Sequence, residues 1–338
     1  MSEPVRNVVI ALTSGGRPDG EAMGAAFEAI FRGESEPVLT AAFLTALAMR
    51  GESASDIAAG AAVMRAHVRR VNAPPGAIDT CGTGGLAWIS LNTSTGAAFV
   101  AAGAGAVVAK HGNRSVPPKT GSADVLEALG VNLNPTDTQL EAGFARAGLA
   151  FMFAPAHHAA MKHVAPVRKV LGIRTVFNLL GPLANPAGAK RQLLGVYSDL
   201  WLVPYAKALR LLGSERAWVV HGQDGMDEVS TTGPTLVTEL KDGEIETFQI
   251  KPEDVGLPIA NPDDLRGGGP ADNAAALTRV LEGAPGPFAD LVALNAGAAL
   301  YVAGLAADLR DGLSQAQLSI STGKAMAALE QLKTATRD

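Results

Sequence analysis

Three polar segments of this chain carry residue types suited to binding phosphate groups and a metal ion. The first is the glycine-rich run 81–85, Cys-Gly-Thr-Gly-Gly, which follows the apolar stretch 77–80 and precedes a helix expected to start near Ser94 and Thr95. Glycines let backbone N–H groups approach an anion, and a helix N-terminus adds partial positive charge. The run matches neither a Gly-x-Gly-x-x-Gly motif nor a P-loop. Taken alone, the run is better explained by a tight strand-to-helix turn than by a phosphate site.

The second segment, 110–122, combines cationic and hydroxyl side chains directly after a short apolar run at 106–109. It contains Lys110, His111, Asn113, Arg114 and Ser115, followed by a Lys-Thr-Gly-Ser run at 119–122. Open α/β sheets bind ligands at the carboxyl ends of their parallel strands. Two polar loops after neighbouring strands therefore predict one site that grips a phosphorylated ligand from both sides.

The third segment places adjacent carboxylates, Asp227 and Glu228, after an apolar run at 217–221. Oxygen ligands beside a phosphate site suit Mg²⁺, which binds through one or two carboxylates plus phosphate oxygens. His157, His158 and His163 lack zinc-ligand spacing and are interpreted as ligand contacts. Arg168 suits either a substrate carboxylate or an ordinary ion pair.

The elements that must position these residues divide the chain into two parts. Apolar spacing is helical from about 20 to 71, with breaks at 33–37 and 50–53, and a Pro-Pro-Gly turn at 72–76 marks a boundary. Beyond it, strand-type runs at 77–80, 106–109, 150–153, 192–197, 217–221 and 235–240 mostly alternate with helical stretches. We predict a helical domain over 1–72 and a larger α/β domain over 77–333 with a mainly parallel central sheet.

Composition excludes several classes of protein. The 338 residues include 28 Lys and Arg against 33 Asp and Glu, a net charge of −5 that argues against nucleic acid as a partner. The 47% hydrophobic content excludes disorder, and a lone cysteine, Cys81, excludes an internal disulfide. The apolar stretch 291–307 is too short and too rich in Ala and Gly for a membrane span. We expect a cytoplasmic protein with no membrane partner.

Six motifs in order along the chain resemble the anthranilate phosphoribosyltransferase family. They are Gly-Thr-Gly-Gly at 82–85, Asn-x-Ser-Thr at 92–95, Lys-His-Gly-Asn-Arg-Ser at 110–115, His-Val-Ala-Pro-Val-Arg at 163–168, Asn-Leu-Leu-Gly-Pro-Leu at 178–183 and Asp-Gly-x-Asp-Glu at 224–228. The resemblance covers about 20 to 333, which makes it far more specific than any single motif. It implies a helical domain to which a segment of about 167–192 returns, and a homodimer formed through that domain.

The resemblance also implies an activity and a set of site residues. The family transfers the phosphoribosyl group of 5-phosphoribosyl 1-diphosphate to the amine of anthranilate and releases diphosphate, in tryptophan biosynthesis. By position, the phosphoribosyl diphosphate would contact Gly82, Thr83, Gly84, Gly85, Asn92, Ser94, Thr95, Lys110, Asn113 and Ser122. Anthranilate would contact Gly82, His111, Asn113, His158, Arg168 and Pro182, and Mg²⁺ would be held by Ser94, Asp227 and Glu228. No nucleophile or general base is implied.

One departure from the family pattern keeps alternatives open. The family usually continues Gly-Thr-Gly-Gly with Asp, whereas this chain has Leu86 followed by Ala-Trp-Ile at 87–89. Leucine cannot accept a hydrogen bond or balance a cation. One alternative is therefore a catalytically silent, ligand-binding relative. A second is an enzyme like a pyrimidine nucleoside phosphorylase, although the acidic pair at 227–228 favours the transferase.

Overall fold

The structure, a computed structural model, describes residues 2–84, 90–115 and 120–337. Four helices come first: α1 (Glu3–Thr13), α2 (Gly20–Phe31), α3 (Pro37–Arg50) and α4 (Ala54–Ala66). The breaks predicted at 33–37 and 50–53 separate α2, α3 and α4, and Ser53 starts α4 with a reciprocal hydrogen-bond pair to Asp56. Helix α1 precedes the stretch predicted to be helical and was not predicted.

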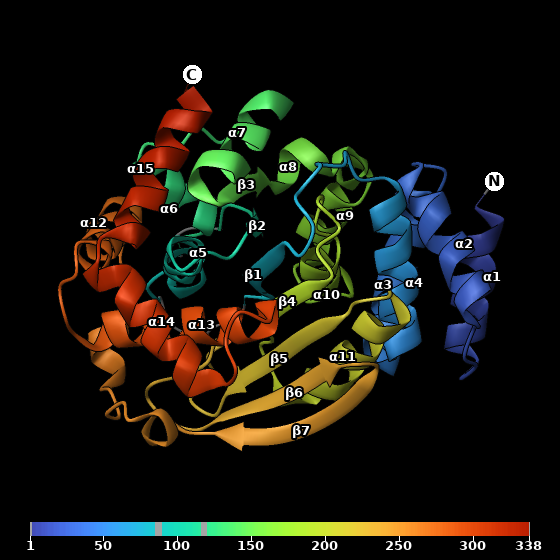
Figure 1. Ribbon diagram of the computed structural model, residues 1–338. Coiled ribbons are helices and arrows are strands. Elements are labelled where there is room, and N and C mark those ends of the chain that lie inside the picture. The colour runs from blue at the N-terminus through green and yellow to red at the C-terminus, as the bar shows by residue number, and fades with distance from the viewer. Residues whose placement is uncertain (1, 85–89, 116–119, 338) are drawn as a thin grey trace.

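A seven-stranded sheet forms the centre of the rest of the chain (Figure 1), in the order β3-β2-β1-β4-β5-β6-β7. Its strands are β1 (Ile78–Gly82), β2 (Val108–Gly112), β3 (Leu149–Phe153), β4 (Arg191–Gly195), β5 (Arg216–Gly222), β6 (Thr235–Lys241) and β7 (Glu244–Ile250). The pairs from β3 to β5 are parallel, while β6 and β7 are antiparallel. The predicted fold class, a helical domain with a mainly parallel α/β sheet, is confirmed.

Two differences from the predicted strands have simple causes. Strand β2 begins at Val108 rather than at 106, and it continues through Lys110 and His111 to Gly112. The sequence predicts a loop for Lys110 and His111, because neither is a typical strand former. Strand β7 was not predicted, because its alternating charged residues lie on the exposed edge of the sheet. Asp242 and Gly243, both with positive φ, form the turn from β6 to β7.

Helices cover both faces of the sheet. On one face pack α5 (Thr93–Gly103), α12 (Pro270–Leu281), α13 (Pro287–Ala303), α14 (Leu309–Ser321) and α15 (Lys324–Arg337). The other face packs on α11 (Leu202–Leu211), and α7 (Asp137–Ala147) covers its β2–β3 end. Most of the apolar stretch 291–307 lies in α13, and its side chains there are almost all buried. None of the helices within the described ranges is long and apolar enough to cross a membrane.

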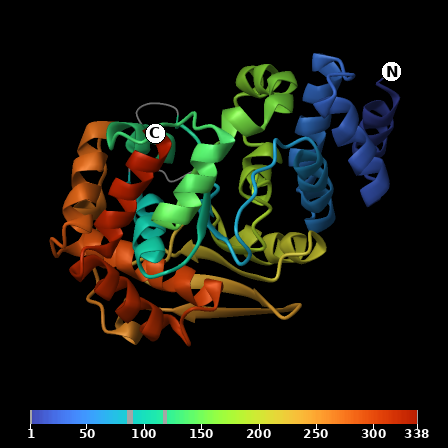
Figure 2. The ribbon, with the colours of Figure 1, turned by 45° about the horizontal axis from the view of Figure 1, so that its top comes forward.

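Figure 2 shows α1–α4 at one end of the molecule and the C-terminal helices at the other. Between them lie α9 (Ala165–Leu171) and α10 (Phe177–Leu180) (Figure 1). Apolar side chains from α1–α4 and from 164–184 belong to one buried cluster, in which Phe27 and Phe177 pack edge to face. The division into domains at 1–72 and 77–333, with 167–192 returning, stays a prediction that this packing supports.

Candidate active site

A cavity of about 320 Å³ opens at the carboxyl ends of β1, β2 and β5. Its described lining brings together most of the residues predicted from the sequence: Gly82, Thr83, Gly84, Asn92, Ser94, Lys110, His111, Asn113, Ser122, Asp227 and Glu228. Parallel strands end at the same edge of a sheet, so loops far apart in sequence meet there. Gly85 and the 86–89 stretch lie outside the described residues.

The loop after β1 is packed against the loop after β5. A Cβ atom at Gly82 would lie 2.4 Å from Oδ2 of Asp227, so a larger residue would displace this carboxylate. Two residues later, the backbone N–H of Gly84 donates to the same Oδ2 at 2.8 Å. Gly82 and Gly84 thus bring the backbone of this loop up to an acidic side chain.

Lys110 supplies a buried positive charge to the cavity. Its side chain is only 2% exposed, and its Nζ donates to the carbonyl oxygen of Thr80 at 2.6 Å and to Oγ of Ser94 at 3.4 Å. Burial lowers the pKa of Lys110, although the charge of Asp79 works against this. Within the described ranges, no carboxylate lies within 4 Å of this ammonium group. A buried cation that touches only neutral oxygens is well placed to bind an anion.

Asp227 and Glu228 form the acidic wall of the cavity. Oε1 of Glu228 accepts from the backbone N–H of Ser94 at 3.3 Å, which joins this wall to the start of α5. Burial, and then the charge of Asp227, raise the pKa of Glu228 to about 8. A divalent cation would relieve this repulsion. In the part of the chain that the structure describes, no group of three or more His, Cys, Asp or Glu could form a metal cage. Two carboxylates and a serine hydroxyl suit Mg²⁺, which completes its shell with phosphate oxygens and water.

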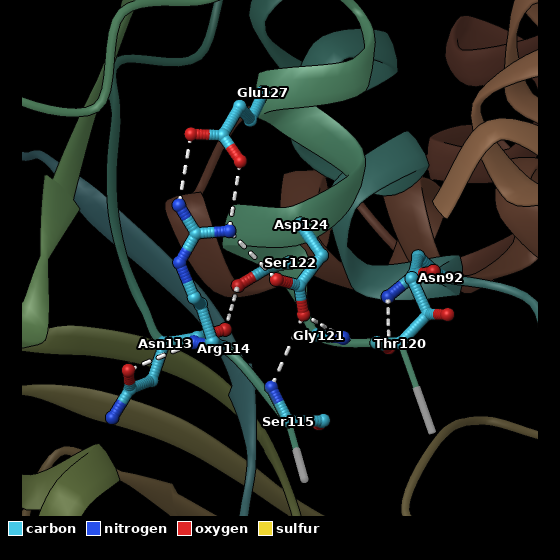
Figure 3. Close-up of polar contacts among 9 residues, drawn as sticks. All are labelled: Asn92, Asn113, Arg114, Ser115, Thr120, Gly121, Ser122, Asp124 and Glu127. Atoms are coloured by element: carbon cyan, nitrogen blue, oxygen red, sulfur yellow. Dashed lines mark hydrogen bonds and ion pairs between the residues drawn. The ribbon is translucent and has the colours of Figure 1, made fainter. Parts of the chain in front are cut away.

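A third wall comes from the polar loop between β2 and α6 (Ser122–Ala128), shown in Figure 3. The Asp124 carboxylate holds both stems of this loop, accepting from the backbone N–H of Ser115 at 3.2 Å and of Gly121 at 2.9 Å. A Cβ atom at Gly121 would lie 2.5 Å from the carbonyl oxygen of Asn113 and from the nitrogen of Ser115. The two stems are therefore in direct backbone contact, and only glycine fits between them.

Arg114 lines the cavity, yet its side chain points toward α6 (Figure 3). Its guanidinium donates two bonds of 2.8 Å to Glu127 and one of 2.9 Å to Asp124. These hydrogen bonds and charges raise the pKa of Arg114. Sequence reasoning missed the roles of Asp124 and Glu127. Their spacing, three and six residues after Gly121, matched a capping box and one further helical turn, and was the available signal.

His111 connects this cavity to a second group of predicted residues. Its Nε2 lies 3.2 Å from Nε2 of His158, and both rings are buried. Burial is the main cause that lowers the pKa of His111 to about 3 and that of His158 to about 4, so both imidazoles are neutral at pH 7. A neutral pair can accept or donate hydrogen bonds without adding charge beside Lys110.

Six predicted residues lie outside the described lining of the cavity: Thr95, His157, His158, His163, Arg168 and Pro182. His157 is buried with its Nδ1 2.9 Å from the carbonyl oxygen of Arg69, and His163 is exposed. Thr95 is buried in α5, and His158 reaches the cavity only through His111. The carbonyl of Pro182 accepts from Nε2 of Gln192 at 2.8 Å, and Arg168 is half-buried with its guanidinium 5.7 Å from the ring centre of Phe177. The lining also includes Ser90, which was not predicted, and Cys81, Ser115 and Thr120, which belong to the predicted polar segments but were given no individual role. Burial raises the pKa of the Cys81 thiol well above its usual value, so this thiol is poorly suited to act as a nucleophile.

The fold and the site together define a glycosyltransferase built from a helical bundle and an α/β domain. The family model described as "Glycosyl transferase family, helical bundle domain" matches residues 6–68, and "Glycosyl transferase family, a/b domain" matches residues 74–326. The anthranilate phosphoribosyltransferase of Hyphomonas neptunium is 50% identical over 339 aligned positions, covering 100% of this chain and 99% of the relative. That of Parvibaculum lavamentivorans is 52% identical, covering 98% and 97%.

Solved structures indicate the same family. The crystal structure of anthranilate phosphoribosyltransferase from Thermus thermophilus has a TM-score of 0.93 and 43% identity, covering all of both chains. The Saccharomyces cerevisiae enzyme in complex with PRPP and Mg has a TM-score of 0.90 and 29% identity, covering 99% of this chain and 98% of the other. This chain belongs to the anthranilate phosphoribosyltransferase family and is an enzyme of the pentosyltransferase class.

Proposed function

We propose that this cavity binds 5-phosphoribosyl 1-diphosphate and transfers its phosphoribosyl group to the amine of anthranilate, releasing diphosphate. The observation that carries the proposal is the joint placement of a buried cation, glycine-loop N–H groups and an acidic pair in one cavity. Such a transfer needs positioned charges rather than a nucleophile, because the C1–O bond breaks toward an oxocarbenium ion. No comparison favours the phosphorylase or the silent binding relative.

The residues proposed to bind phosphoribosyl diphosphate, the donor, divide into one positively charged group and several neutral groups. Lys110 would bind an anionic oxygen of the donor, and the glycine loop from Gly82 would lie against other oxygens, with the Gly84 N–H shared with Asp227. Asn92, Ser94, Asn113 and Ser122 would contribute neutral hydrogen bonds. Thr95, buried in α5, would act by holding the start of that helix in place. This arrangement binds several phosphate oxygens while leaving C1 open to attack.

The acidic wall would hold Mg²⁺ through Asp227, Glu228 and the hydroxyl of Ser94. When bound, Mg²⁺ neutralises charge on the departing diphosphate. Around it, the Gly84 N–H orients the Asp227 carboxylate, and the Ser94 N–H orients that of Glu228. The relative from Saccharomyces cerevisiae, described with PRPP and Mg, supports this use of the metal.

On the acceptor side, the neutral pair His111 and His158 would face the anthranilate, with Gly82, Asn113 and Pro182 along its path. Arg168 would pair with the anthranilate carboxylate. No carboxylate pairs with its guanidinium among the described ion pairs, and burial lowers its pKa, so an anionic partner would relieve the cost of burying this charge. The related Saccharomyces cerevisiae structure in complex with 4-fluoroanthranilate supports an aromatic acceptor of this kind.

We also propose that the chain works as a cytoplasmic homodimer formed through the helical domain. Val38 and Met49 on α3 and Val170 on α9 are more than 80% exposed although they are apolar, and such patches are typical of interfaces. Light scattering coupled to size exclusion tests the mass. A monomer at micromolar concentration would contradict the dimer.

The test of the activity is the loss of anthranilate fluorescence when the purified protein is mixed with phosphoribosyl diphosphate over a magnesium series. Saturable, magnesium-dependent loss is the expected result. No loss at any magnesium concentration would overturn the proposal. A Leu86→Asp variant measured in parallel would show whether the departure at this position changes the KM for phosphoribosyl diphosphate or the magnesium optimum.

A further inference from the structure

Asp79 is a fully buried carboxylate that the proposed reaction does not use. It lies in β1, directly before the glycine loop, with 0% exposure. Its Oδ1 accepts from the backbone N–H of His111 at 3.2 Å, and its Oδ2 accepts from Nδ2 of Asn185 at 2.8 Å. Because both oxygens accept hydrogen bonds, the contacts suit the ionised form. Burying a carboxylate costs free energy unless its charge is compensated, so a fully buried carboxylate next to the cavity indicates a specific role.

Asn185 extends this contact into a three-way junction. Its Nδ2 also donates to the carbonyl oxygen of Ala109 at 2.8 Å, and its Oδ1 accepts from the backbone N–H of Ala187 at 2.8 Å. The side chain is 3% exposed. Asp79 and Asn185 thus join β1, the carboxyl half of β2 and the segment that follows Pro182.

These three segments carry different parts of the site. Strand β1 leads into the glycine loop, and β2 carries Lys110 and His111. The segment before Asn185 contains Pro182 and packs against the helical bundle. The charged groups around Asp79 are Lys110 and, beyond it, Glu228, and the Cys81 thiol on the same face of β1 also hydrogen-bonds its carboxylate.

We infer that Asp79 is a positioning residue that, through the backbone of His111 and the side chain of Asn185, sets the distance between the donor-binding and the acceptor-binding sides of the cavity. This inference rests on the proposed function. Asp79 touches neither substrate in this scheme. Its removal would leave each binding surface largely intact but misalign the two surfaces, and misplacement by about 1 Å can reduce a rate about 10²-fold.

The test compares Asp79→Asn with a matched control, Asp56→Asn. Asp56 is also a buried carboxylate, 2% exposed, and it accepts from Arg50 and from the backbone N–H of Ser53 at 2.8 Å, but it lies in the helical bundle. We expect Asp79→Asn to lower kcat roughly 10- to 100-fold. The KM for phosphoribosyl diphosphate and its calorimetric Kd should stay within about threefold. Asp56→Asn should lower Tm and leave kcat within about twofold.

A second variant separates positioning from packing. In Asp79→Asn, the new amide has one oxygen for two donors, so either the His111 N–H or the Asn185 amide meets an NH2 group. Asn185→Ala leaves the Asp79 carboxylate in place but removes its contact with the segment that follows Pro182. We expect Asn185→Ala also to lower kcat, while the calorimetric Kd for phosphoribosyl diphosphate stays within about threefold. If Asp79→Asn does not fold, Asn185→Ala still tests the same junction from its other side.

Two results would overturn the inference: a kcat of Asp79→Asn within twofold of the unchanged chain, or a kcat of Asn185→Ala within twofold of it. If the protein without substitutions has no activity, that result would instead contradict the proposed function. The two failures are therefore distinguishable.

Discussion

The buried pair His111 and His158 should make folding sensitive to acid. The pKa of His111 is lowered from 6.5 to about 3 and that of His158 from 6.5 to about 4. Below about pH 6.5 the unfolded chain gains protons at both positions while the folded protein stays neutral there. Stability is therefore present at neutral pH and is lost as the pH falls from about 6.5 toward 4. Lys110 and His157, the charged and titratable neighbours, oppose protonation of the pair further.

The size of the loss follows from these values. One pKa unit corresponds to about 1.4 kcal/mol, so each histidine costs about 2 kcal/mol between pH 7 and pH 5, and the pair about 3–4 kcal/mol. Glu228 works in the opposite direction, because its pKa is raised to about 8 and its protonation on acidification favours the folded state. That contribution is common to the unchanged chain and to a histidine variant. It cancels when the two are compared.

The assay is urea unfolding at pH 7, 6 and 5, followed by tryptophan fluorescence. We expect His111→Gln/His158→Gln to be less stable than the unchanged chain at pH 7, because Gln packs poorly in the space of an imidazole, but to lose about 3–4 kcal/mol less on acidification. The control is His163→Gln, which replaces an exposed histidine outside the buried pair. Parallel pH profiles for the double variant and the unchanged chain would refute the reasoning.

Three further predictions concern the walls of the cavity. Gly121→Ala should raise the KM for phosphoribosyl diphosphate about tenfold or more, because its Cβ would lie 2.5 Å from two backbone atoms; Gly24→Ala, with open space around it, is the control and should be neutral or slightly stabilising. An unchanged KM would contradict the close loop contact. Glu127→Gln should change stability little, because this ion pair is exposed, but it should leave Asp124 as the one charged partner described for Arg114, so that Arg114 binds anions more readily and diphosphate inhibits two- to fivefold more strongly. Unaltered inhibition would show that Arg114 does not reach the ligand. Asp227→Asn should raise the magnesium concentration for half-maximal rate about tenfold or more, and EDTA should abolish the activity of the unchanged chain. A rate independent of magnesium in both would contradict the metal site.

Much of the fold could be predicted from the sequence because its signals are local. Apolar runs of strand length located β1 to β6 to within a few residues, and the breaks between α2, α3 and α4 were visible as Gly, Ser and Pro clusters. Strand β7 was missed because an edge strand needs no apolar face. The sequence also could not show that β2 continues through Lys110, since a buried lysine is favoured only by its surroundings in the folded protein.

Most of the site could be predicted for a different reason. Polar residues that follow apolar strands mark the ends of a parallel sheet, so Gly82, Lys110 and Asp227 could be placed together from their order alone. What could not be predicted depends on contacts distant in sequence. The junction between Asp79 and Asn185 joins residues 106 positions apart. Asp79 lies in an apolar run, so the sequence indicates only that it belongs to a strand.

The alternation of β2 would let one short strand serve both proposed substrates. Successive residues of a strand point to opposite faces of the sheet. Lys110 therefore points toward α5 and the hydroxyl of Ser94, whereas His111 points to the other face and His158. The positive charge needed near diphosphate is thus separated by the strand itself from the neutral ring proposed to face the aromatic acceptor. Asp79 lies on the His111 side and fixes the backbone of that residue, so it holds the end of the strand on which this separation depends.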